Sequence, residues 1–125
     1  MKARLLLVED SEVNAYLARF LLEREGYVVE VALNGEQALS AARQRRPDLV
    51  LMDIRLPVMD GYEATRRIRA DPQLADVPVV ALSAHALALE KAQALACGCI
   101  AHIDKPIEVE HFVDQVRSLL PTSLR

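Results

Sequence analysis

The chain contains few cysteines and no long apolar run. Cys97 and Cys99 are its only cysteines, and a single glycine separates them. Two cysteines without further metal-binding side chains nearby predict free thiols rather than a structural disulfide or a metal site. Apolar stretches such as Leu5–Val8 are far shorter than the roughly 18 residues that a membrane helix requires. The sequence therefore predicts a protein that does not span a membrane.

The chain also lacks the apolar stretch of a signal peptide and an excess of positive charge. Only four apolar residues separate the basic segment Met1–Arg4 from Glu9, whereas a secretory leader needs roughly 7–15. We therefore expect the protein to stay in the cytoplasm. Its 18 acidic and 15 basic side chains give a net charge of -3, which disfavours a nucleic-acid binder that relies on bulk charge.

The composition and the hydrophobic pattern predict one α/β domain. Hydrophobic residues make up 52% of the 125 residues and charged residues 26%, so we assign residues 1–125 to a single folded domain. Short runs rich in valine, leucine and isoleucine alternate with amphipathic stretches, which predicts a parallel sheet covered on both faces. The predicted strands are Arg4–Val8, Val28–Ala32, Leu49–Met52, Val79–Leu82 and Ile100–Ile103.

Five helices are predicted between and after these strands. The first is capped by Ser11 and ends at Gly26, and the second opens at Asn34 with a capping pattern towards Gln37. The inward face of the first helix is predicted to carry Val13, Leu17, Phe20 and Leu21. The other helices are predicted at Gly61–Arg69, at Leu87–Ala96, and between Pro106 and Pro121, the last with Glu108 and Glu110 in its first turn and Val109 on its buried face.

Polar residues stand at the ends of four predicted strands. Glu9 and Asp10 follow the first strand, Asp53 the third, Ser83 the fourth, and Lys105 comes two residues after the fifth. Ligands of open α/β sheets bind beyond the carboxyl ends of the strands. If the first and third strands are neighbours, three carboxyl groups converge there, and protonation or a cation must relieve their repulsion. Oxygen ligands of this kind favour Mg²⁺.

These residues belong to segments that, taken together and in this order, resemble a known family. The segments are Glu9–Asp10, Leu51–Gly61, Leu82–Ala84 and Lys105–Pro106, within a similarity that extends from Leu5 to Leu120. The sequence is similar to the receiver domain of two-component response regulators. The resemblance implies a flavodoxin-like, doubly wound, five-stranded parallel sheet of order 2-1-3-4-5 with five helices.

The resemblance also implies a reaction. Asp53 would accept a phosphoryl group from the phosphohistidine of a histidine kinase or phosphotransfer protein. Mg²⁺ would be held by Glu9, Asp10, Asp53 and the backbone carbonyl of Arg55. Phosphoryl transfer depends mainly on positioning and charge neutralisation. The family is therefore a phosphoacceptor signalling domain rather than an enzyme, with only self-catalysed phosphorylation and dephosphorylation.

Lys105 and Ser83 would contact the phosphoryl oxygens, and Ser83 with His102 would form the conformational switch. His102 stands where the family has tyrosine or phenylalanine, so its aromatic role is open, and a titratable ring there predicts a pH-dependent coupling. His85 and Arg55 flank the predicted site and are expected to tune the lifetime of the phosphate.

The expected output is a change in the surface formed by the fourth helix, the fifth strand and the fifth helix. The partners implied are the phosphodonor protein and a downstream protein target, without direct nucleic-acid or membrane contact, and the chain is expected to be a monomer or weak dimer. A stand-alone receiver and a domain cut from a larger regulator or hybrid kinase both remain open.

Three other functions fit the sequence less well. A phosphatase with an aspartate nucleophile needs a second acid two residues later, where this chain has Arg55. A nucleotide or flavin carrier needs a glycine-rich phosphate loop, but the segment after the first strand is acidic. A receiver-like module that is never phosphorylated would not need all of the polar residues at the strand ends. This chain has them together: Glu9, Asp10, Asp53, Ser83 and Lys105.

Overall fold

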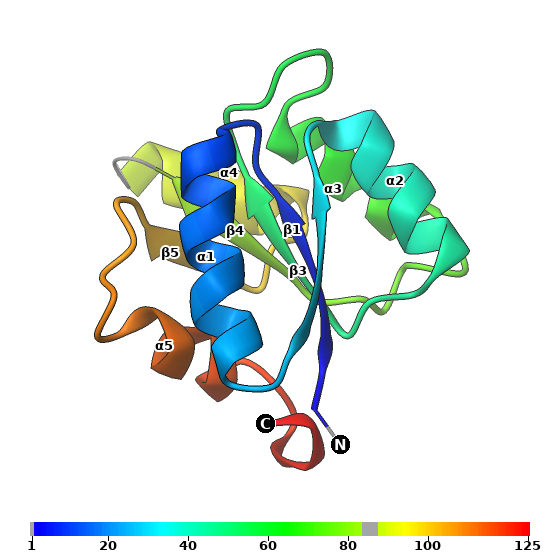
Figure 1. The fold of residues 1–125 in the computed structure, drawn as a ribbon. Coiled ribbons are helices and arrows are strands. Elements are labelled where there is room, and N and C mark those ends of the chain that lie inside the picture. Colours follow the sequence, from blue (N-terminus) through cyan, green and yellow to red (C-terminus); the bar gives the residue numbers. More distant parts are fainter. Residues whose placement is uncertain (1, 84–87) are drawn as a thin grey trace.

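The computed structural model describes residues 2–83 and 88–125. Its strands are β1 (Arg4–Val8), β2 (Val28–Ala32), β3 (Leu49–Asp53), β4 (Val79–Ser83) and β5 (Ala101–Asp104). They form one parallel sheet in the order β2-β1-β3-β4-β5 (Figure 1), which confirms the predicted fold class. Asp53 and Ser83 are the last residues of their strands rather than the first residues after them, a shift of one position.

The helices cover the two faces of this sheet. Their bounds are α1 (Glu12–Arg24), α2 (Gly35–Gln44), α3 (Gly61–Ala70), α4 (Ala88–Cys97) and α5 (Phe112–Ser118), followed by a short 3-10 helix, η1 (Thr122–Leu124). Helices α1 and α5 lie on one face, and α2, α3 and α4 on the other (Figure 1). Within the described residues, none of the helices combines the length and apolar character that a bilayer crossing requires.

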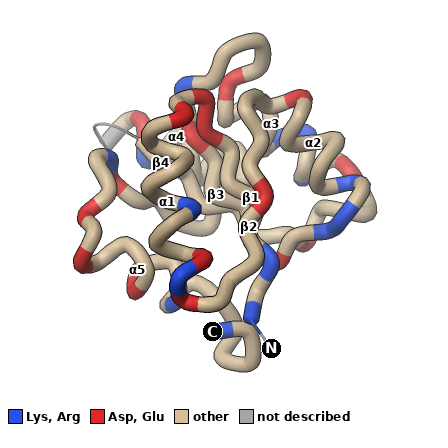
Figure 2. The backbone as a smooth tube through the Cα atoms, in the orientation of Figure 1, with Lys and Arg blue, Asp and Glu red and all other residues tan. Residues whose placement is uncertain are grey.

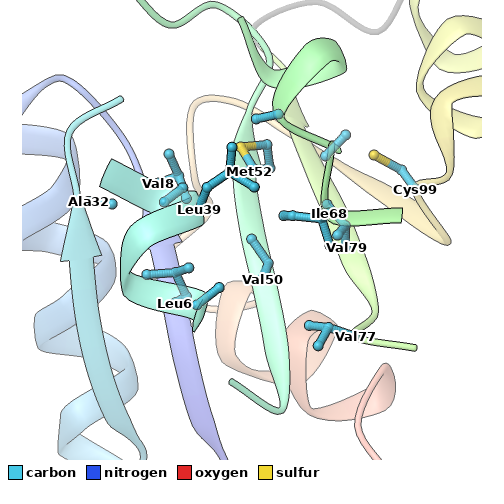
Figure 3. Close-up of a cluster of buried hydrophobic side chains, with 14 of the residues drawn as sticks. Leu6, Val8, Ala32, Leu39, Val50, Met52, Ile68, Val77, Val79 and Cys99 are labelled. Carbon is cyan, nitrogen blue, oxygen red and sulfur yellow. The ribbon is translucent and has the colours of Figure 1, made fainter. Parts of the chain in front are cut away.

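Each face of the sheet has its own hydrophobic cluster. Leu6, Val8, Val50 and Met52 point from β1 and β3 towards α2, α3 and α4, where Ile68 packs against them (Figure 3). The alternate residues of the same strands face α1 and α5, and the largest fully buried side chain on that face is Phe112. Because successive strand side chains point to opposite faces, a sheet buried on both sides requires the nearly continuous apolar strands seen in the sequence.

The predicted helix caps are present. The Ser11 hydroxyl accepts a hydrogen bond from the Asn14 N–H, and the side-chain Oδ1 of Asn34 accepts one from the Gln37 N–H. Asp60 caps α3 in the same way. These side chains satisfy N–H groups that have no partner within the helix itself.

The predicted inward face of α1 is wrong at two of its four residues. Leu21 is buried and Leu17 packs against the same cluster, as predicted. Val13 is 78% exposed and Phe20 is 50% exposed, whereas Ala15 and Ala18 are buried together with Leu21 and Leu22. Small alanines let the helix backbone approach the sheet closely, so the buried stripe is rotated around the helix away from the larger apolar residues.

The predicted start of the last helix is also wrong. Helix α5 begins at Phe112, so Glu108 and Glu110 precede it and Val109 is 52% exposed. Both His111 and Phe112 donate their N–H to the carbonyl of Glu108 in a turn that leads into the helix. The segment after Pro106 is needed to bring the chain back from the end of β5, and burial of Phe112 fixes where the helix can start.

Both cysteines are free and buried. Burial, together with the neighbouring Cys97, raises the pKa of the Cys99 thiol to about 12, which suppresses the reactive thiolate at neutral pH. We expect iodoacetamide at about pH 8 to modify the native protein at least about 100-fold more slowly than the urea-unfolded protein. Time-resolved mass spectrometry measures both rates, and equal rates would contradict the buried placement.

Candidate functional site

The ends of the parallel strands bring the predicted site residues to one edge of the sheet. Strands β1 and β3 pair in register so that Val8 lies beside Met52, and each is followed directly by an acidic residue, Glu9 and Asp53. Strands β4 and β5 add Ser83 and, just past the end of β5, Lys105. The site therefore depends on pairing between segments far apart in the sequence.

Three carboxylates form the acidic part of the site. Glu9, Asp10 and Asp53 each offer an oxygen within 4.8 Å of the others. Figure 2 shows acidic segments gathered at the end of the sheet from which α1 starts. Glu9 and Asp53 are buried, at 3% and 5% exposure, whereas Asp10 is exposed. Carboxylates held this close in a partly buried site require a positive charge nearby.

Lys105 provides part of that charge from the end of β5. Its Nζ lies 2.6 Å from Glu9 Oε1 and 3.1 Å from Asp53 Oδ2. Burial alone would lower the pKa of Lys105, but hydrogen bonds and charge attraction from Glu9 and Asp53 outweigh it and raise the pKa above its ordinary value. The lysine backbone N–H donates to the carbonyl of Ser83 at 2.7 Å, which ties this position to β4.

The loop after β3 holds Asp53 in place. Asp53 Oδ1 accepts a hydrogen bond of 3.0 Å from the backbone N–H of Arg55. The N–H of Gly61 donates to the carbonyl of Ile54 at 2.9 Å, so the start of α3 lies directly against the end of β3. A Cβ at Gly61 would lie 2.3 Å from the Asp53 carbonyl oxygen. The sequence predicts Gly61 as the start of a helix and not as a contact of Asp53, although a glycine at this position is a signal of close approach.

The two predicted switch residues lie on adjacent strands. Ser83 is buried at the end of β4, and His102 is half-buried on β5, where it pairs with Ala81. His102 Nε2 lies 2.7 Å from Asp104 Oδ1. The prediction for His85 lies outside the described residues, as does Ala84 of the motif after β4.

Arg55 makes a contact for which the sequence carries no local signal. Its guanidinium lies 3.2 Å from Glu90 Oε1, so the loop after β3 is bridged to the first turn of α4. Tyr62 reaches the same turn, with its hydroxyl 3.4 Å from the Glu90 carbonyl. A pair separated by 35 positions carries no local sequence pattern.

The donor atoms of the acid cluster suit a hard divalent cation. All three side chains are carboxylates, the ligand type that Mg²⁺ prefers, and Lys105 contacts only one oxygen of Glu9 and one of Asp53. Asp10 is exposed, and its carboxylate has no hydrogen-bond or ion-pair partner within residues 2–83 and 88–125. The second oxygens of Glu9 and Asp53 accept the backbone N–H groups of Ser11 and Arg55. The Asp10 carboxylate is therefore left over for a metal beside the lysine.

Comparison with known sequences connects this geometry to a described family. The family model "Response regulator receiver domain" matches residues 5–117. The polar-differentiation response regulator DivK of Brucella anthropi is 41% identical over 120 residues, which cover 96% of this chain and 98% of that protein.

Solved structures show the same similarity. The receiver domain of the sensor histidine kinase PA1611 from Pseudomonas aeruginosa, solved with a magnesium ion coordinated in its active-site cleft, is 37% identical with a TM-score of 0.86, covering 94% of this chain and 97% of that one. The chemotaxis protein CheY4 of Vibrio cholerae is 28% identical with a TM-score of 0.91, covering 96% and 100%.

Proposed function

The chain belongs to the response regulator receiver domain family, and from this premise we propose that Asp53 accepts a phosphoryl group from the phosphohistidine of a histidine kinase or phosphotransfer protein. As a receiver domain of two-component signalling, it is a signalling protein rather than a member of a classical enzyme family. We assign this function to the whole of residues 1–125, and self-catalysed transfer and dephosphorylation are part of the proposal.

The observation that carries the proposal is the environment of Asp53. The carboxylate ends β3 beside two other acids and is contacted by the only lysine that reaches the cluster within the described residues. Its side chain is 7% exposed, so it is largely enclosed but still reaches the surface. A carboxylate nucleophile that is oriented by the Arg55 N–H and has positive charge beside it meets the main requirement of phosphoryl transfer, which is positioning.

In the proposed reaction an oxygen of Asp53 attacks the phosphorus atom of the phosphohistidine. The new O–P bond forms as the P–N bond breaks, and the electron pair of that bond returns to the imidazole of the donor. Lys105, which contacts Asp53, would bind one phosphoryl oxygen, and the buried Ser83 hydroxyl would donate a hydrogen bond to another. Water attack on the acyl phosphate ends the signal.

We propose Glu9, Asp10, Asp53 and the backbone carbonyl of Arg55 as the holders of Mg²⁺. The convergence of three carboxylates and the free oxygens of Asp10 support this assignment. When bound, the metal neutralises phosphoryl oxygens that this acidic site would otherwise repel. Lys105 Nζ lies 2.6 Å from Glu9 Oε1, and the Ser11 N–H donates to Glu9 Oε2. We therefore assign the contact of Glu9 with the ion through water.

The proposed output is a two-state change at the surface of α4, β5 and α5. Ser83 moving towards the phosphoryl group would draw the start of α4 with it, and the Arg55–Glu90 ion pair already links the phosphorylation loop to that helix. His102 is proposed as the switch residue on β5. A ligand shifts such an equilibrium only by its differential affinity for the two states. Arg55 and His85 are proposed to tune the phosphate lifetime.

We propose a cytoplasmic monomer or weak dimer that receives the phosphoryl group from one protein and presents the changed surface to another, without direct nucleic-acid or membrane contact. The net charge of -3 supports the absence of nucleic-acid binding through bulk charge.

The experiment that tests the function is phosphorylation by a small donor. Incubation with acetyl phosphate and Mg²⁺ should add about 80 Da to the intact mass, the mass of one phosphoryl group. Asp53→Asn should abolish the addition, because an amide oxygen is not a comparable nucleophile. Omission of Mg²⁺ should also abolish it.

Asp60→Asn is the matched control for this experiment. Asp60 lies in the same loop and caps α3, and asparagine is an equally good cap. This variant should gain the same mass as the wild type. An unmodified wild-type protein, or equal modification of Asp53→Asn, would refute the assignment of Asp53.

A further inference from the structure

Strand β2 forms an open edge of the sheet. Among the described residues it pairs with β1 alone, and residues of a parallel strand use their backbone groups alternately on the two sides. The Val28 N–H donates to the Ala3 carbonyl and the Ala32 carbonyl accepts from the Glu9 N–H, so these even-numbered positions face β1. The N–H and C=O groups of Val29 and Val31 therefore point outwards, and within the described residues they have no hydrogen-bond partner.

A groove of about 630 Å³ runs along this edge between α1 and the end of α2. Its lining residues are Arg4, Arg19, Val28, Val29, Glu30, Val31, Gln44 and Arg45. Three of them are arginines and only one, Glu30, is acidic. Figure 2 shows basic segments on α1 and at the end of α2, to either side of β2. The groove therefore combines unpaired backbone groups with an excess of positive charge.

The arginines flank β2 on both faces of the sheet. Arg4 shares the face of Leu6 and Val8, which pack on the α2 side, and Arg45 follows the last residue of α2. Arg19 approaches from α1 on the opposite face. Neither Arg4 nor Arg45 has an ion-pair partner within residues 2–83 and 88–125, whereas Arg19 is paired with Glu23 at 3.1 Å.

We propose that the β2 edge is a docking site for an extended acidic segment of a partner protein, which adds to the sheet as a sixth strand. The outward N–H and C=O groups of Val29 and Val31 would pair with its backbone. The side chains of an added strand alternate between the two faces, so carboxylates at successive positions would meet Arg19 on one face and Arg4 or Arg45 on the other.

The charge balance favours an acidic partner over a second copy of this chain. Pairing of two β2 edges would bring three arginines and one glutamate of one copy against the same set of the other, and like charges placed opposite each other oppose association. The groove also lies towards the start of β1, at Arg4, whereas the acid cluster follows the end of that strand. Docking is therefore separate from phosphorylation of Asp53.

The test uses two blocked fluorescent peptides, EEVEVEE and KKVKVKK, in anisotropy titrations against the full chain. The acidic peptide should bind at least tenfold more tightly than the basic one, and raising the salt concentration should weaken it. Arg4→Glu combined with Arg45→Glu should reduce its affinity at least tenfold. The charge-matched control, Arg24→Glu combined with Arg66→Glu, lies outside the groove and should change the affinity less than twofold.

Two measurements on the unmodified chain keep the proposal testable if the arginine variant does not fold. Binding should slow hydrogen exchange of the Val29 and Val31 amides, since these gain partners, and leave Val28 unchanged. Methylating the EEVEVEE backbone nitrogens at one set of alternate positions should abolish binding, and methylating the other set should preserve it.

The other outcomes would overturn the proposal. Equal affinity for the acidic and the basic peptide would mean that the arginines do not discriminate between partners by charge. Tight binding without protection of Val29 and Val31 would mean a charge contact without strand addition. A dimer of the free chain that the acidic peptide does not displace would assign the edge to a second copy.

Discussion

Replacing Gly61 by alanine is expected to destabilise the protein by about 2–3 kcal/mol and to abolish phosphorylation of Asp53. The added Cβ would lie 2.3 Å from the Asp53 carbonyl oxygen and 2.8 Å from Ile54 Cα. Both are backbone atoms, so the clash is relieved only by moving the end of β3 or the start of α3, and overpacking of this kind costs about 1–3 kcal/mol. Movement of β3 displaces the Asp53 carboxylate from Lys105, and movement of α3 disturbs the loop in which the Arg55 N–H orients that carboxylate.

Urea unfolding measures the first effect and the mass gain with acetyl phosphate measures the second. Gly26→Ala is the control, because its Cβ would make only ordinary van der Waals contacts, the nearest at 3.5 Å to Lys2 Cγ, and only the positive φ of +94° opposes alanine. That variant should lose about 1 kcal/mol and keep full phosphorylation. A Gly61→Ala protein as stable as Gly26→Ala and normally phosphorylated would contradict the close approach of α3 to β3.

Replacing Lys105 by methionine is expected to lower the free energy of unfolding by about 3 kcal/mol in the absence of divalent cations. Lys105 contacts Glu9 and Asp53, whose side chains are 3% and 7% exposed, and removing one partner of a buried ion pair costs about 3–5 kcal/mol. We take the lower end, since the lysine side chain itself is 16% exposed. Phosphorylation should also slow at least tenfold, because a charge beside the phosphoryl oxygens is lost.

The direction of the pH dependence of the stability difference between wild type and Lys105→Met follows from the pKa of Lys105. The pKa of Lys105 is raised above its usual 10.5 by Glu9 and Asp53, so its stabilising contribution is complete below that pH and is lost only as the pH rises through the elevated pKa. The stability gap between wild type and Lys105→Met should therefore be constant from about pH 7 to 9.

Unfolding experiments with EDTA and with excess Mg²⁺ complete this test. Added Mg²⁺ should stabilise Lys105→Met more than the wild type, because a cation that binds only the folded acid cluster replaces the missing charge. Lys91→Met, on the exposed surface of α4, is the matched control and should stay within about 0.5 kcal/mol of the wild type. Equal stability of both variants would contradict the ion-pair geometry.

The strands could be read from the sequence because burial on both faces leaves a local pattern. Each is a short apolar run, and predicted and observed bounds differ by one residue at most. The inward face of α1 could not be read in the same way, since the pattern of large apolar residues indicates Val13 and Phe20 while the sheet requires small alanines. Helix α5 starts at Phe112, later than predicted, because burial of Phe112 in the core decides where the helix begins, and the local sequence does not show that burial.

The candidate site was predictable as a set of residues but not as a set of contacts. Parallel strands end at the same edge of a sheet, so acids after β1 and β3 had to meet. The sequence does not show that Glu9 is the closest partner of Lys105. The two residues follow β1 and β5, which are not adjacent in the sheet, so their contact depends on how the side chains are oriented. The same holds for the Arg55–Glu90 pair and for the approach of Gly61 to Asp53, which depend on how helices pack against the loop.

The lysine that balances the acid cluster stands far behind the acids in the chain. The Asp53–Lys105 contact spans 52 positions, so a ribosome releases all three carboxylates well before it releases their counter-charge. A growing chain whose first strands have already paired therefore carries uncompensated negative charge at this edge until Lys105, just past the end of β5, is in place. The final strand thus completes the charge balance of the molecule as well as its sheet.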